Sequence, residues 1–230
     1  MKRNTYLRGQ IIRIMRILIF AFVLCCGIFW GCAAQQQSAH AGFTENYFQP
    51  LTAGDTIFFS LNTPKGMRAN PIPYDTFLNH VDTALWREVN YIMEGEQTEI
   101  VGLSHFPIDP EHEAYIVGLT YSWYGNTSLL ILNKRRQNFV DLVPVAEFYG
   151  GDGGQVLRNS WCFDVDRNGV RDLVIRDSHH TLVIDENGEQ RDIYEEYVSI
   201  YILKPKGFVN AEIQDSSALI RAYPVDLNWE

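Results

Sequence analysis

The feature that most limits the fold of this chain is a succession of short runs rich in aromatic and β-branched residues. Between residues 89 and 204, polar or glycine-containing turns separate these runs. Such residues favour extended strands, and close spacing favours pairing of sequential strands into hairpins. The runs are VNYIM, EIVGLSHF, AYIVGLTYS, SLLILN, FVDLVPV, DLVIRD, TLVIDE and YVSIYIL. We therefore expect a mainly β domain of antiparallel hairpins, built as blade-like sheets of a partial propeller, as an open sheet or as a sandwich.

One segment upstream of these runs predicts a helix. It is NPIPYDTFLNHVDTALW, in which Asp75 is placed to cap the helix N-terminus. Leu78, Val81 and Leu85 then recur on one face, as expected of a helix that packs against a sheet. A short strand, TIFFSLN, and a turn at residues 63–66 are expected before it. The fold class is thus mainly β with one N-terminal helix.

Two further patterns organise the C-terminal half. Asn187-Gly188 and Lys206-Gly207 predict tight hairpin turns. Residues 106–137 and 163–190 also share the order acidic loop, apolar strand, turn, apolar strand, hairpin. This faint similarity indicates an internal repeat of the kind found in repeated β-blades.

The first thirty-one residues predict an export signal. Five basic residues precede the first acidic residue, Glu45, and the stretch Ile17–Trp30 is apolar throughout. A membrane-spanning helix needs about 20 apolar residues, so this stretch is short for a span. We therefore expect residues 1–31 to be a signal peptide.

The end of this segment resembles a bacterial lipoprotein signal. Gly31-Cys32 closes the apolar run, and the small and polar residues AAQQQSAHAG follow. The resemblance implies a lipid on Cys32 and a flexible tether over residues 32–50. The length and the strand pattern of the remaining chain predict a single mainly β domain over residues 51–230. The resemblance also implies a cell-envelope location, on the periplasmic face of an outer membrane or on the cell surface. An ordinary cleaved signal and an uncleaved anchor remain alternatives.

The charge of the chain narrows the class of partner. Nineteen basic and twenty-eight acidic residues give a formal net charge of −9, and the predicted signal holds five of the basic residues. An acidic domain disfavours nucleic acid and suits a divalent cation or a basic protein. Cys162 is the single cysteine after Cys32, so an internal disulfide is excluded. We expect it to be a buried side chain rather than a nucleophile.

One loop has the spacing of a metal site. Asp164, Asp166, Asn168 and Asp172 occupy relative positions 1, 3, 5 and 9, with Gly169 at position 6. Calcium takes about six to eight oxygen ligands, and a loop that coils around the ion supplies them from alternate side chains. Position 12 is an isoleucine, and an apolar strand follows in place of a helix, so the loop is not a full EF-hand.

The pattern D-x-D-x-N-G-x-x-D before an apolar strand resembles the calcium loops of FG-GAP and VCBS-type repeats. The resemblance implies Ca²⁺ bound by the side chains of Asp164, Asp166, Asn168 and Asp172 and by the backbone carbonyl of Val170. The alternative is an Asp/Asn-rich turn stabilised by its own hydrogen bonds. The corresponding segment of the first repeat, IDPEHEA, lacks the glycine and the alternation, so no ion is expected there.

Other motifs favour ordinary structural roles. YGGDGGQ lacks the lysine of a phosphate-binding loop and is interpreted as a β-connection. His179 and His180 are expected in a turn, and on a strand they would point to opposite faces. No serine lies in a nucleophile motif. The remaining carboxylates with catalytic potential show no distinguishing spacing; they are Glu111, Glu113, Glu195 and Glu196.

These patterns predict a non-catalytic, calcium-binding, lipid-anchored binding module of the cell envelope. Its membrane contact would be the lipid on Cys32, and its partner an envelope protein. One alternative is a periplasmic inhibitor of a peptidoglycan-degrading toxin, because the organisation of the chain is similar to that of certain calcium-binding inhibitors of this kind. An enzyme acting on glycans or wall polymers is the third possibility.

Overall fold

The computed structural model describes residues 42–52, 54–61, 68–88, 98–121, 124–151, 153–211 and 216–224. The chain divides into two units, Met1–Phe43 and Thr44–Glu230. The expected signal peptide, Cys32, the turn at 63–66 and the strand at 89–93 lie outside the described residues. Among those described, no helix has the length and apolar character needed to cross a membrane.

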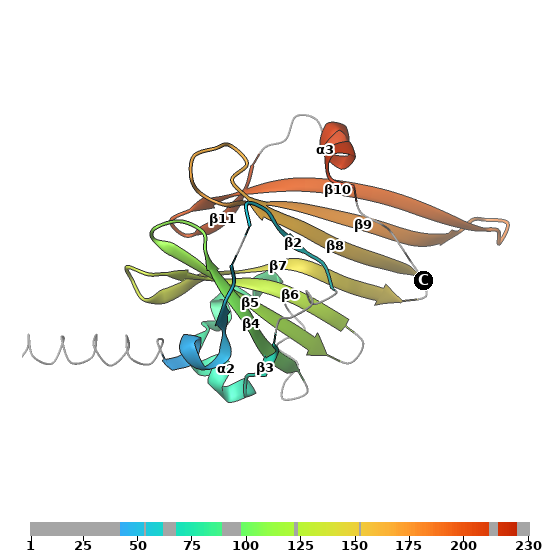
Figure 1. Ribbon diagram of the computed structural model, residues 1–230. Coiled ribbons are helices and arrows are strands. Elements are labelled where there is room, and N and C mark those ends of the chain that lie inside the picture. Colours follow the sequence, from blue (N-terminus) through green and yellow to red (C-terminus); the bar gives the residue numbers. More distant parts are fainter. Residues whose placement is uncertain are drawn as a thin grey trace, which may run out of the picture. The chain divides into compact units, whose positions relative to one another are not determined.

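The second unit is built on one open, mixed sheet of eleven strands (Figure 1). The strand order is β1-β4-β5-β6-β7-β8-β9-β10-β11, with β2 added to β8 and β3 to β4. All pairs are antiparallel except β1 with β4. The strands are β1 Gln49–Pro50, β2 Ile57–Phe59, β3 Asn70–Pro71, β4 Glu99–Pro107, β5 His112–Tyr121, β6 Tyr124–Asn133, β7 Asn138–Gly151, β8 Gly154–Phe163, β9 Asp172–Ile184, β10 Gln190–Lys204 and β11 Gly207–Ala211.

The prediction of a mainly β fold made of sequential hairpins is confirmed, as an open sheet. Neighbouring strands from β4 to β11 pair in chain order. Both predicted hairpin turns are present, since β9 and β10 flank Asn187-Gly188 and β11 begins at Gly207. The residues 44–50, which the sequence places in the tether, are ordered: β1 pairs with β4, and Phe48 is buried against Tyr115.

The repeat predicted from the sequence is not reproduced. The first copy folds as two separate antiparallel strands, β5 and β6. In the second copy the run DLVIRD and the first four residues of TLVIDE belong to a single strand, β9, which continues through the expected turn. Strand β9 stays extended there because its neighbours β8 and β10 hydrogen-bond to it on both sides.

The predicted helix is shorter than expected. Helix α2 covers Tyr74–His80, and a 3₁₀ helix, η1, follows over Thr83–Glu88. The helix cap is not Asp75, because Pro73 occupies the N-cap position and no side chain caps the helix. Asp82 instead accepts a hydrogen bond from the Ala84 N–H at the start of η1. A third helical segment, α3 Ser216–Ala222, contacts β10.

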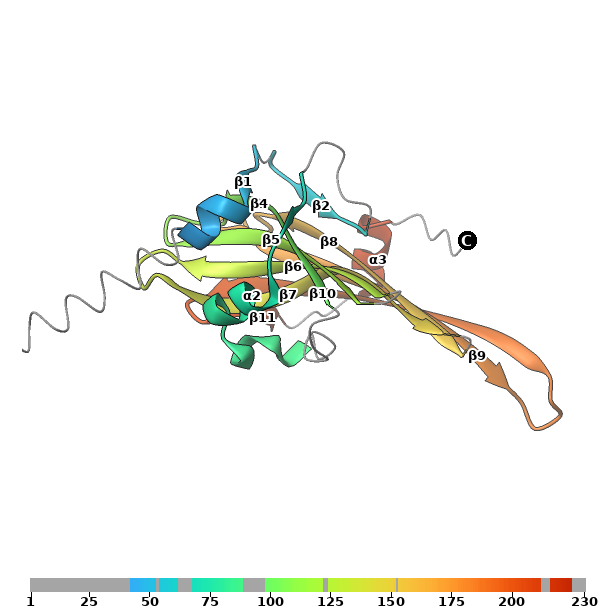
Figure 2. The same cartoon turned by 90° about the horizontal axis from the view of Figure 1, so that it is seen from below.

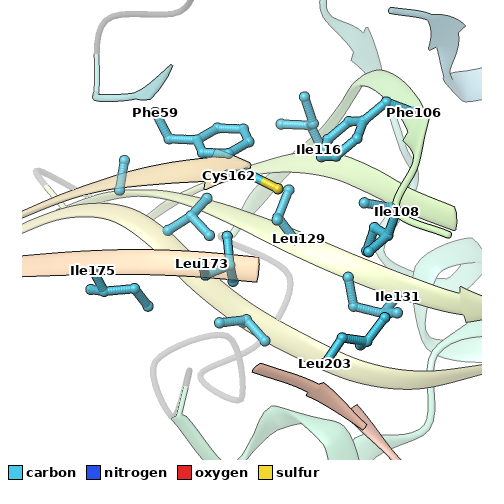
Figure 3. Packing of buried hydrophobic residues seen from close by; sticks show 14 of the residues in the cluster. Phe59, Phe106, Ile108, Ile116, Leu129, Ile131, Cys162, Leu173, Ile175 and Leu203 are labelled. Atoms are coloured by element: carbon cyan, nitrogen blue, oxygen red, sulfur yellow. The ribbon is translucent and has the colours of Figure 1, made fainter. Parts of the chain in front are cut away.

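The sheet curls around one apolar core, so that its distant strands supply residues to the same cluster (Figure 3). Phe106 from β4, Leu129 from β6, Leu173 from β9 and Leu203 from β10 meet there, and Phe106 and Leu129 are fully buried. Burying a large side chain of this kind contributes about 1.5–3 kcal/mol. The curl also brings β11 to β7, where the Phe208 N–H donates to the Asp141 carboxylate at 2.7 Å.

Candidate metal centre

The loop Asp164–Arg171 connects β8 to β9 at one end of the core. Phe163 and Asp172 form the last cross-strand pair below it. Residues outside the loop hold it against the domain. The Arg171 N–H donates to the Ile108 carbonyl at 3.2 Å. The Arg171 guanidinium donates to the carbonyls of Gly54 and Asp55, at 2.9 and 3.0 Å. Its position is therefore set by tertiary contacts as well as by its own turn.

The chain reverses through two residues with positive φ. Gly169 has φ 86° and Arg167 has φ 63°, a region in which glycine is favoured and arginine is uncommon. The Asp164 carboxylate accepts the N–H of Asn168 at 2.9 Å and of Gly169 at 2.8 Å. The Val170 N–H donates to the Asn168 side-chain oxygen at 2.7 Å. The turn thus uses its own side chains as acceptors, as Asp/Asn-rich turns do.

Three of the predicted ligands come together. Asp164, Asp166 and Asp172 each present one carboxylate oxygen, and these oxygens lie within 4.8 Å of one another. Asp166 is exposed, Asp164 is half-buried and Asp172 is completely buried. Three like charges at such separations repel each other, and an ion or a proton between them relieves the repulsion.

Asp172 is the carboxylate of this group whose hydrogen-bonding capacity the described residues do not fill. Its Oδ2 accepts the Val165 N–H at 3.3 Å, whereas its buried Oδ1 has no hydrogen-bond partner among the described residues. Burial raises the pKa of its carboxyl above 3.8, and the charges of Asp166 and Asp164 raise it further. The backbone N–H groups of Val165 and Leu203 oppose that rise without cancelling it.

The other two predicted ligands, Asn168 and Val170, make contacts within the turn and with the core. The Asn168 side chain is engaged within the turn: its oxygen accepts the Val170 N–H and its amide donates to Asp166 at 3.0 Å. In this conformation the Asn168 oxygen is therefore bonded within the turn and does not join the three carboxylates as a fourth ligand. Val170 packs partly against the core cluster. The fit to a cation thus rests on Asp164, Asp166 and the unsatisfied oxygen of Asp172.

A second acidic turn lies beside this loop and was not expected to hold an ion. Asp109 accepts the N–H groups of Glu111 and His112, both at 2.6 Å, and its carboxylate bonds the His112 Nδ1 at 3.0 Å. The His112 Nε2 faces the Asn133 amide at 3.1 Å. Burial raises the pKa of Asp109, but these hydrogen bonds outweigh it and leave the pKa below 3.8. The Asp–His–Asn arrangement was not recognised from sequence, because Asn133 lies on another strand.

The remaining sequence candidates occupy separate places. Cys162 is fully buried in the core, and burial raises the pKa of its thiol to about 12, so it is no nucleophile at neutral pH. His179 and His180 lie within β9 rather than in a turn, and as neighbours on a strand they face opposite sides. The described residues of YGGDGGQ lie at the paired ends of β7 and β8, as expected of a β-connection. Glu113 pairs with His105 at 2.5 Å, and Glu196 with Arg176 at 2.6 Å.

No family model matches the chain, and neither the curated proteins nor the solved structures include a significant match.

Proposed function

We propose that this chain is a non-catalytic, calcium-binding module of the bacterial cell envelope, anchored through a lipid on Cys32. The observation that supports the calcium part is the buried Oδ1 of Asp172, which has no hydrogen-bond partner among the described residues and lies beside two further carboxylates. Leaving a buried acceptor unsatisfied costs about 1–3 kcal/mol, and more for a charged group. A cation at this point supplies the missing partner and removes the repulsion among the three acids.

The donor set favours calcium over other metals. Carboxylate and carbonyl oxygens are hard ligands, which suit calcium and magnesium rather than zinc or copper. Calcium tolerates irregular coordination by a loop, whereas magnesium demands a compact octahedron. The proposed ligands are the side chains of Asp164, Asp166, Asn168 and Asp172 and the carbonyl of Val170. Asn168 joins them by rotating its amide, which gives up its bond to the Val170 N–H.

The proposed role of the ion is structural. The loop contacts the Ile108 carbonyl and, through Arg171, the carbonyls of Gly54 and Asp55. An ion that orders the loop therefore also steadies the contacts between β9, the β4–β5 turn and the segment before β2. Exported modules bind calcium with dissociation constants of about 10⁻⁴ to 10⁻³ M. The lipoprotein-like Gly31-Cys32 pattern supports a location where such concentrations occur.

The experiment is a thermal melt of the purified protein with calcium, with magnesium and with chelator. At about 100 times its dissociation constant, a ligand that binds only the folded state adds roughly 2.7 kcal/mol. We expect that gain with calcium, a smaller one with magnesium and none for Asp166→Ala. Asp185→Ala is the matched control, because Asp185 also accepts backbone N–H groups in an exposed turn, those of Asn187 and Glu189.

The control separates the two interpretations of the loop. A calcium shift that survives Asp166→Ala, or no shift in the unaltered protein, would show that the loop is a self-stabilised turn. Loss of the shift in Asp185→Ala would show that the calcium response is not specific to the β8–β9 loop. Mass spectrometry of the membrane fraction tests the anchor: a diacylglyceryl mass on a chain that begins at Cys32 is expected, and an unmodified N-terminus contradicts it.

A further inference from the structure

The outer part of the β9–β10 hairpin, residues 179–197, is here called the arm, and beyond Thr181 it extends past the neighbouring strand β8 (Figure 2). Strand β8 accompanies β9 only as far as the pair Gly154–Thr181. On the other side, β11 pairs with β10 only from Ile200 onward. Within the described part of the chain, no strand pairs with the outer edge of Gln190–Glu195. Beyond Thr181 the arm is therefore a projecting two-stranded ribbon, and among the described residues no strand pairs with its outer backbone edge.

The arm carries several large apolar side chains that are exposed to solvent. Ile184 is 62% exposed, Tyr194 61% and Tyr197 51%, and together they are half of the six large hydrophobic residues that stand out as exposed in the described part. Exposed aromatic side chains gathered on one projecting element are typical of binding surfaces. Tyrosine is especially suited to this role, because its rigid ring offers a large contact area at a small loss of side-chain entropy.

Both faces of the arm carry the same trio of a histidine, a tyrosine and an acid. On one face, His180 stacks on Tyr194 with ring centroids 4.8 Å apart, and its Nε2 bonds Asp192 at 2.6 Å. On the other face, His179 packs edge-on to Tyr197 at 5.2 Å. The Tyr197 hydroxyl donates to Glu195 at 3.1 Å. The two tyrosine rings are thus held in place by their neighbours, which lowers the entropic cost of binding to them.

The charge of the arm selects the kind of partner. Residues 179–197 contain one basic residue, Arg191. Their six acidic residues are Asp185, Glu186, Glu189, Asp192, Glu195 and Glu196. A tyrosine ring beside a carboxylate attracts lysine and arginine through both the ring and the charge. The same charge disfavours an anionic lipid surface, and it opposes the pairing of two copies of this arm.

We propose that the arm docks an arginine- or lysine-rich segment of another protein, which lies along the free edge of β10 and contacts the Tyr194 and Tyr197 trios. This surface deepens the proposed binding module by naming where its partner attaches and what chemistry the partner has. It rests on that proposed function, yet it uses none of the calcium ligands. The basic side chains of the segment meet Asp192 and Glu195, and its backbone adds to the edge of the sheet.

The test is titration of the ¹⁵N-labelled protein with a peptide of ten alternating arginine and serine residues, compared with a glutamate-serine peptide. We expect amide shifts concentrated in residues 179–197 with the basic peptide and none with the acidic one. The paired substitution Asp192→Lys with Glu195→Lys should weaken binding at least about tenfold more than Glu45→Lys with Glu99→Lys. Both pairs change exposed acids and give the same net charge.

A third variant separates the tyrosines from the charge. Tyr194→Ala with Tyr197→Ala leaves the net charge unchanged and should still weaken binding, whereas Tyr149→Ala, an exposed tyrosine outside the arm, should not. Equal loss in both charge-reversal pairs, shifts spread over all acidic surfaces, or a dimer by sedimentation would overturn the proposal. Melts with calcium on the arm variants keep the two proposals distinct, because loss of peptide binding with an intact calcium shift contradicts the arm alone.

Discussion

Two acidic turns lie side by side in this molecule and handle their carboxylates in opposite ways. The Arg171 N–H of the β8–β9 loop reaches the Ile108 carbonyl next to Asp109, so both turns share one corner of the fold. Asp109 receives hydrogen bonds from two backbone N–H groups and from His112. The Asp172 Oδ2 accepts a long bond from the Val165 N–H, and its buried Oδ1 has no hydrogen-bond partner among the described residues. The pKa of Asp109 is accordingly lowered, whereas that of Asp172 is raised.

The difference shows that acidic composition does not by itself make a cation site. A carboxylate that has its own donors needs no ion, because those donors already replace the water it lost on folding. A carboxylate that is buried beside other acids without enough donors is destabilising until a cation or a proton arrives. The first condition describes Asp109 and the second describes Asp172.

The largest expected effect concerns calcium and Asp172. In Asp172→Asn the charge is gone while the shape is kept, so the roughly 2.7 kcal/mol gained by unaltered protein at about 100 times the dissociation constant should disappear. Without calcium, the same variant should be at least as stable as the unaltered protein, because it no longer buries an unsatisfied charge. Chemical denaturation with and without chelator measures both. If Asp172→Asn is less stable than the unaltered protein without calcium and is still stabilised by calcium, the proposed role of Asp172 is contradicted.

The next largest effect concerns the turn at Asp109, whose carboxylate is fully hydrogen-bonded. Asp109→Ala removes three hydrogen bonds and leaves the buried His112 Nδ1 without its acceptor, so we expect a loss of about 2 kcal/mol in the free energy of unfolding. The calcium response should persist, since the ligands are untouched. Urea denaturation compares this variant with Asp172→Asn. Similar behaviour of the two variants would remove the distinction between the turns.

The pH dependence of stability should separate the same two residues. Because the folded pKa of Asp109 is lowered, its stabilisation is present above pH 3.8 and is lost as the pH falls through the folded pKa. Because the folded pKa of Asp172 is raised, its carboxylate becomes destabilising as the pH rises from 3.8 through the folded pKa. In chelator, the gap between Asp172→Asn and the unaltered protein should therefore widen with rising pH. The deficit of Asp109→Ala should shrink at low pH.

The smallest expected effect tests the backbone of the loop. Gly169→Ala meets no neighbouring atom, so its cost comes only from the positive φ of 86°. We expect a loss of about 1 kcal/mol in stability and weaker calcium binding, because the turn that gathers the ligands is strained. Gly151→Ala, at the end of β7 and also in open space but without a positive φ, is the control. Equal loss in both variants would point to a general effect of removing glycine.

Much of the fold followed from local pattern. Runs of Ile, Val, Leu and Tyr predicted the strands, and Asn187-Gly188 and Lys206-Gly207 predicted their hairpins. The prediction failed where tertiary pairing outweighed local signals. The polar residues of β9 between Arg176 and Thr181 suggested a turn, but strands on both sides keep them extended. Helix α2 ends at His80 because Val81 becomes extended and Asp82 begins a new turn.

For the candidate site, the sequence by itself determined which oxygen-bearing side chains stand at alternate positions around Gly169 and that a strand follows them. Spacing along the chain is a local property, so it needs no knowledge of the rest of the fold. Only the tertiary structure decided that Asp172 is buried with an unpartnered oxygen while Asp109 is fully bonded. Burial and the supply of hydrogen-bond donors depend on the curl of the whole sheet, which brings together residues that are far apart in the chain.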